Sequence, residues 1–232
     1  MRKKVNGVIV LTLLFSAALA HGDMNRVYHP YVEQQEREIE YGFVVRDIDH
    51  ASVLLNRVGA GYSWNEKFFS EIYVLTESIT HDNEQVRGYE VELKWQLTEQ
   101  GEYWADWGLQ IEAGTAKDIY SHELAIGVLW EKELSNRWVA TTNFLLEYEY
   151  GSDIHNEFET ALQGQLRYRN SAKFDPAVEI YLDDQNRALG PTFMGAIKLS
   201  GRKQLHWELG VLFGIDAETP STNLRGGIEL EF

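Results

Sequence analysis

Charged side chains recur at alternate positions over much of the sequence, and these residues could do chemistry together if they faced one enclosed space. A row of carboxylates attracts cations, whereas neighbouring arginines attract anions. An excess of charge cannot be dry and unpaired, so water or ion pairs must accompany it. The candidates are Glu90, Glu92, Lys94, Glu112, Glu123, Glu147, Glu149, Arg167, Arg169, Glu179, Asp183, Lys198, Glu208, Arg225 and Glu229.

Arg167 and Arg169 are the basic residues of greatest interest, because the strands expected beside them carry Glu147, Glu149, Glu179 and Asp183. Adjacent strands lie about 4.8 Å apart, so these charges are expected to pair across the sheet. A belt of ion pairs that stiffens the wall is the favoured interpretation. A charged constriction that selects solutes is the alternative.

Ser121 and His122 are a possible nucleophile and base, as a lipid hydrolase would require. Neighbouring side chains on a strand point to opposite faces, however, so these two diverge. No third partner is evident, and no catalytic residue is assigned.

Metal and cofactor sites find little support. The chain has no cysteine, and phosphate loops, zinc signatures and dinucleotide fingerprints are absent. His21, Met24 and His29 could hold copper near a new N-terminus, but no ligand geometry is visible. We expect neither a cofactor nor a metal.

The elements that must position the charged residues are strands, since apolar and polar residues alternate with period two. From Tyr89 to Leu97, for example, Tyr, Val, Leu, Trp and Leu alternate with Glu, Glu, Lys and Gln. A helical period of 3.6 would scatter the apolar positions around the axis. Strands are predicted at about 36–46, 52–62, 67–77, 89–97, 103–113, 123–131, 138–149, 162–169, 176–183, 191–200, 205–213 and 223–232.

The N-terminus predicts export. Arg2, Lys3 and Lys4 precede an apolar run that ends in Ala18-Leu19-Ala20, which is the pattern of a signal peptide cleaved near Ala20. Residues 1–20 are therefore assigned as the signal peptide and 36–232 as the β domain. Residues 21–35 lack alternation and are predicted to be a periplasmic lead-in, with a short insert into the lumen as the alternative. The formal net charge of −15 argues against nucleic acid as a partner.

A membrane β-barrel fits this chain better than a soluble β-sandwich or lipocalin-like barrel. No apolar run after the signal is long enough for a spanning helix, yet aromatic residues make up 12% of the chain. Several of them lie near predicted strand ends, where membrane barrels carry aromatic girdles at both interfaces. We therefore predict an all-β, antiparallel transmembrane β-barrel of twelve strands with short periplasmic turns.

The last residues, RGGIELEF, resemble the C-terminal signal of bacterial outer-membrane β-barrel proteins. Arg225, Gly227, Leu230 and Phe232 occupy its polar, glycine, apolar and terminal aromatic places. The resemblance implies the bacterial outer membrane as the location, its lipid as a partner, and recognition of the last strand by the outer-membrane assembly machinery.

Three functions remain open for such a barrel. A narrow passive diffusion channel for small polar solutes or ions, with an acidic and weakly cation-preferring lumen, is favoured because twelve strands lie between the side-chain-filled eight and the open sixteen. A non-conducting structural or adhesion barrel is the second. An outer-membrane lipid hydrolase is the third and least supported.

Overall fold

The computed structural model describes residues 26–48, 51–80, 84–117, 120–184 and 186–232. Signal-peptide residues 1–20, with His21 and Met24, lie outside them. The described residues contain no helix that is long and apolar enough to cross a membrane.

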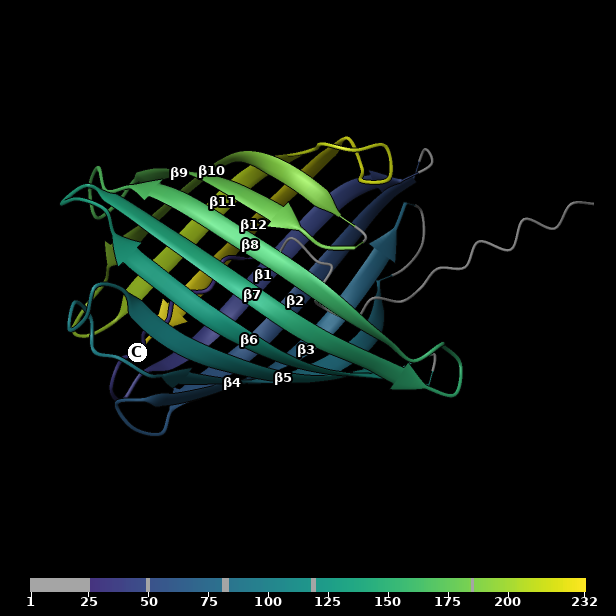
Figure 1. Cartoon of the computed structure of the whole chain (residues 1–232), viewed down its shortest axis with the longest axis horizontal. Coiled ribbons are helices and arrows are strands. Elements are labelled where there is room, and N and C mark those ends of the chain that lie inside the picture. The colour runs from purple at the N-terminus through teal and green to yellow at the C-terminus, as the bar shows by residue number, and fades with distance from the viewer. Residues whose placement is uncertain (1–25, 49–50, 81–83, 118–119, 185) are drawn as a thin grey trace, which may run out of the picture.

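The structure is a closed antiparallel barrel of twelve strands (Figure 1), as the alternation predicted. Each strand pairs with its neighbours in sequence, and β12 closes the barrel against β1. The strands are β1 (Arg37–Ile48), β2 (Ala51–Ser63), β3 (Phe68–Ile79), β4 (Gln85–Gln96), β5 (Asp106–Ala116), β6 (Ser121–Glu133), β7 (Trp138–Gly151), β8 (Glu157–Tyr168), β9 (Asp175–Leu182), β10 (Arg187–Lys198), β11 (Gln204–Gly214) and β12 (Thr222–Glu231).

The two ends of the barrel differ in what they carry. At one end β1 begins and β12 ends, beside the connections 64–67, 97–105, 134–137, 169–174 and 199–203. We call this the terminal end and the opposite one the loop end. Figure 1 marks the C-terminus at the terminal end.

Tyr103 and Trp104, which were predicted from the sequence to lie in a strand, lie in the connection before β5.

Aromatic residues gather at both ends of the outer surface. All seven tryptophans lie at the terminal end, in or beside the strand ends and turns there: Trp64, Trp95, Trp104, Trp107, Trp130, Trp138 and Trp207. Neighbouring rings are in contact, for example Phe68 with Trp95 at 5.4 Å and Trp138 with Tyr168 at 5.0 Å between centroids. At the loop end, the ring of Tyr148 lies 4.6 Å from that of Phe158. Such belts are typical of the two interfaces of a membrane barrel.

The barrel reverses the polarity of an ordinary soluble protein. Large apolar side chains point outward and stay exposed, such as Ile72 (62%) and Ile126 (49%). Carboxylates point inward and are buried, such as Glu90 and Glu123 at 2% each. An outward apolar band around a polar interior is the arrangement that lipid requires of a barrel.

Two inward aromatic rings are admitted by glycines on the adjacent strand. A Cβ atom at Gly59 would lie 2.3 Å from Tyr73 Cε1, and one at Gly61 would lie 2.3 Å from Phe69 Cζ. Because such distances are far inside contact range, a larger residue on β2 would displace these rings from the interior.

Candidate functional site

The interior wall of the barrel is the candidate site, and period two decides which residues reach it. Among the described residues, thirteen acids are buried and only two arginines, Arg57 and Arg225. The buried acids are Glu38, Glu40, Glu71, Glu90, Glu92, Asp106, Glu112, Glu123, Glu131, Glu147, Glu149, Glu179 and Glu231. Because acids outnumber bases so strongly on this wall, the two buried arginines are important for balancing its charge.

The first basic group, Arg57 on β2, holds a cluster in the middle of the barrel. Its Nη2 donates to Glu92 Oε1 at 2.9 Å, and its Nε lies 3.6 Å from Glu40 Oε1. The guanidinium carbon lies 3.7 Å from the centroid of the Tyr73 ring, within cation–π distance. Arg57 thus ties β2 to β1 and β4 across the face of β3.

The second basic group, Arg225 on β12, is fully buried and reaches β9. Its Nη2 donates to both carboxylate oxygens of Glu179, at 2.6 and 2.7 Å, and its Nη1 donates to Glu208 at 2.7 Å. Arg225 can lie along the wall because the residue opposite it on β11 is Gly210. Tyr181 donates its hydroxyl to the same Glu179 at 3.0 Å.

Residues 26–36, which we call the N-terminal insert, lie inside the barrel. Tyr28 N donates to Asn143 Oδ1 at 2.7 Å, and Asn143 Nδ2 donates to Tyr28 O at 2.8 Å. The hydroxyl of Tyr28 donates to Glu92 at 2.9 Å and accepts from Arg57 at 3.1 Å. These contacts place residues 26–35 against the inner wall, which fits the alternative of an insert into the lumen, and the assignment of residues 21–35 as a periplasmic lead-in stays a prediction.

Further contacts hold the rest of the insert. Tyr31 donates to Asp106 at 2.7 Å, Val32 N donates to Gln96 Oε1 at 2.7 Å, and Arg26 pairs with Glu40 and Glu229. Gly108 makes room for it, since a Cβ there would lie 3.0 Å from Pro30 Cβ.

A cavity of about 310 Å³ remains between the insert and the wall. Its acidic side includes Glu36, Glu38 and Glu231, and its basic groups include Lys94 and Arg167. His29 of the insert also lines it, with its ring stacked on Tyr31 at 5.7 Å. This cavity is therefore lined by both negatively and positively charged side chains.

The pairing expected for Arg167 and Arg169 is wrong. In the antiparallel β7–β8 pair, Arg167 lies opposite Val139, while Glu147 and Glu149 lie opposite Glu159 and Glu157 near the loop end. Arg169 instead pairs with Glu133 at 2.5 Å, outside the cavity. The β8–β9 register sets Glu179 opposite Gln165, which donates to it at 2.8 Å.

The other predicted positions divide into three groups. Lys94, Glu208 and Glu229 line the cavity with Arg167. Asp183 and Lys198 lie at strand ends, Asp183 accepting from Asn186 N and Lys198 exposed. Buried in the wall are Glu90, Glu92, Glu112, Glu123, Glu147, Glu149, Glu179 and Arg225. Whether any of them lines a conducting path stays a prediction.

Ser121 and His122 do not form a catalytic pair in this structure. Ser121 is fully buried on the inner face, and His122 is exposed on the outer face with its ring 5.4 Å from that of Tyr150.

Sequence reasoning missed the interior residues of β1–β3 and the insert, namely Glu38, Glu40, Arg57, Glu71, Tyr73, Arg26, Tyr28 and Tyr31. The alternation of Glu36, Glu38 and Glu40 was the one usable signal. The polar partners of the insert have no periodic signature.

Proteins similar to this chain are found among solved structures. No protein-family model and no curated protein matches the sequence. Among solved structures, a KdgM porin in complex with disordered oligogalacturonate has a TM-score of 0.58 at 10% identity, over 84% of this chain and 99% of that one.

Two more structures are comparably similar. An outer membrane channel from Pseudomonas putida F1 has a TM-score of 0.58 at 12% identity, over 90% of this chain and 99% of that one. The β domain of the Bordetella autotransporter BrkA has a TM-score of 0.53 at 12% identity, over 86% and 100%. At identities this low, the similarity concerns the fold alone. The fold of this chain is that of the outer-membrane β-barrel porins and channels.

Proposed function

We propose that the chain is a narrow outer-membrane channel for small polar solutes or ions, with the terminal end in the periplasm and the N-terminal insert as its constriction. The observation that carries the proposal is the charged cavity of about 310 Å³ between the insert and the wall of a closed barrel. A structural barrel has no need of such a space, whereas a channel does.

The acidic wall supports a weak preference for cations. Thirteen buried acids face two buried arginines among the described residues, and rings of carboxylates bias a pore toward cations. The C-terminal motif supports insertion by the outer-membrane assembly machinery, with the surrounding lipid as the other partner.

A non-conducting structural barrel is the second candidate, and one specific observation favours it. The insert and the Arg57 cluster join opposite walls near the middle of the barrel. If these contacts persist, they close the path that ions would take.

Planar-bilayer recording of the refolded mature protein tests the two candidates. Stepwise currents whose reversal potential in a salt gradient indicates cation preference would support the channel. Silence from protein that shows heat-modifiable gel migration would exclude an open pore and leave the structural barrel.

A further inference from the structure

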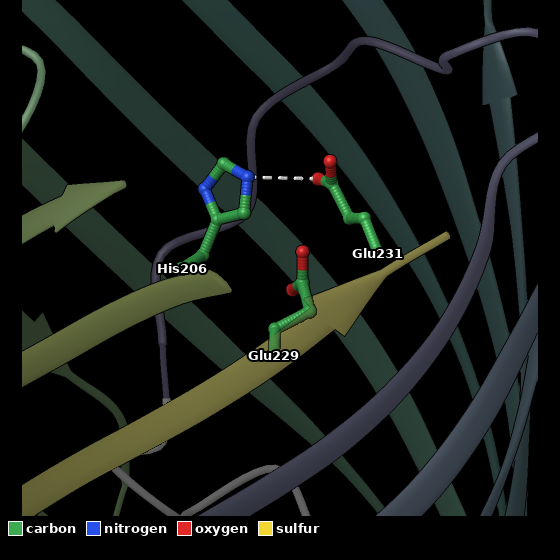
Figure 2. A group of neighbouring side chains, drawn as sticks. All are labelled: His206, Glu229 and Glu231. Carbon is green, nitrogen blue, oxygen red and sulfur yellow. Dashed lines mark ion pairs between the residues drawn. The ribbon is translucent and has the colours of Figure 1, made fainter. Parts of the chain in front are cut away.

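Three metal-ligand side chains converge at the terminal end of the interior (Figure 2). His206 comes from β11, and Glu229 and Glu231 come from β12. The ladder sets His206 directly opposite Glu229 and Gln204 opposite Glu231, so Glu231 is the diagonal neighbour of the imidazole. One ligand atom from each of the three lies within 4.8 Å of the other two.

The imidazole nitrogen that faces this group has one protein partner, the carboxylate of Glu231. His206 Nε2 is shielded from solvent and lies 3.0 Å from Glu231 Oε1, at ion-pair distance but without the alignment of a good hydrogen bond, while the rest of the His206 side chain is 40% exposed. Glu231 is itself 9% exposed. A nitrogen lone pair and a carboxylate at this distance repel unless a proton or a metal ion lies between them.

The surroundings concentrate negative charge. Glu36 and Glu38 of the next strand region form an overlapping group with Glu229, again within 4.8 Å. Glu33 also lines the cavity, and the cationic groups that face it are Arg26, Lys94 and Arg167. Arg26 Nη2 occupies Glu229 Oε2 at 2.8 Å, which leaves Glu229 Oε1 for another partner.

We propose that His206, Glu229 and Glu231 form a binding site for a divalent transition-metal cation of the zinc class. One imidazole and two carboxylates are a three-ligand set of the kind that zinc accepts, with about 2.0–2.2 Å to each donor and a water in the fourth position. His206, Glu229 and Glu231 all line the cavity, so a metal ion held by them would be open to it. The site is additional to the channel proposed above and does not depend on conduction.

The direct alternative is a protonated His206 that forms a plain ion pair with Glu231. The metal site and the ion pair differ in what they bind. The ion pair does not involve Glu229 and takes up no metal. A comparison of Zn²⁺ with Ca²⁺ distinguishes the role of the imidazole from that of the carboxylates. Hard cations such as Ca²⁺ take oxygen ligands, whereas imidazole suits zinc.

Calorimetric titration of tag-free, refolded mature protein with ZnCl₂ is the test. We expect one saturable site, weakened by about 100-fold or more in His206→Gln and in Glu231→Gln, since loss of a ligand costs at least as much as loss of an outer-shell partner. His122→Gln is the matched control, because this histidine is exposed on the outer face of β6, and it should bind as the parent does. Ca²⁺ should show no loss of affinity in His206→Gln.

Heat-modifiable migration of each variant confirms that the barrel has formed. Absence of saturable zinc binding by the folded parent would overturn the site. Equal binding by parent and His206→Gln would also overturn it, and loss of binding in His21→Gln or His29→Gln alone would assign the metal to the N-terminal segment instead.

Discussion

Asn143 on β7 pairs with both backbone polar groups of Tyr28, accepting from its N–H at 2.7 Å and donating to its carbonyl at 2.8 Å. The side chain replaces the strand partner that this part of the insert lacks. A buried backbone N–H or C=O left without a partner costs about 1–3 kcal/mol, so Asn143 stabilises the backbone of the insert at Tyr28 in addition to the side-chain contacts described above.

Asn143→Ala should release the insert around Tyr28. We expect faster hydrogen–deuterium exchange of the Tyr28 amide, and larger single-channel conductance as the constriction widens. Gln163→Ala is the control, since Gln163 lies opposite Asn143 on β8 and faces the same interior. If exchange at Tyr28 were equal in the two variants, Asn143 would not be the residue that holds the insert.

The outward apolar band permits a test of the membrane itself. Ile126 lies on the outer face of β6 and is 49% exposed, so Ile126→Lys would cost almost nothing in a protein surrounded by water. In a bilayer, a lysine on the lipid face near the midplane costs about 2–4 kcal/mol. Urea unfolding in lipid vesicles measures the difference.

Leu134→Lys is the matched control for that experiment, because Leu134 has a similar exposure (55%) but lies in a connection at the terminal end. We expect it to change the free energy of unfolding by about 0–1 kcal/mol, as a change near the interface does. Equal effects at the two positions would contradict the proposed lipid face.

Arg225 should be the most sensitive single residue of the wall. Arg225→Met removes the cationic partner of Glu179, which is itself fully buried, and breaking a buried pair on one side costs about 3–5 kcal/mol. Arg225→Met combined with Glu179→Gln should recover part of the loss in free energy of unfolding. Arg169→Ala, which breaks an exposed pair with Glu133, should cost only about 0–1 kcal/mol.

Refolding in vitro is essential for the Arg225 variants, because Arg225 also occupies the polar place of the C-terminal motif. A defect seen only in cells would point to assembly rather than to the ion pair. Failure of the Glu179→Gln change to restore stability would mean that Glu208 or packing dominates the contribution of Arg225.

The strands could be predicted because lipid and interior impose opposite polarities on successive residues. β4, with Glu90, Glu92 and Lys94 between apolar neighbours, is the clearest case. β1–β3 gave a weaker signal because Gly59, Gly61, Phe69 and Tyr73 occupy inward positions, so the inner face there is not uniformly polar.

Ion-pair partners could not be predicted in the same way. Alternation decides which face a side chain takes, but the register decides which residue it meets, and in an antiparallel pair the start of one strand meets the end of the next. Arg225 on β12 meets Glu179 on β9, with β10 and β11 between them, and the insert binds through single side chains such as Asn143. Neither relationship leaves a local pattern in the sequence.

Arg167 and Arg169 lie in different surroundings, so their removal should affect ion preference differently. Arg167 lines the cavity, whereas Arg169 pairs with Glu133 outside it. Removing a positive charge from an acidic passage strengthens its attraction for cations. Arg167→Ala should therefore shift the reversal potential in a salt gradient toward greater cation preference, and Arg169→Ala should leave it as in the parent. Identical shifts in both variants would mean that the permeation path does not run through the cavity beside Arg167.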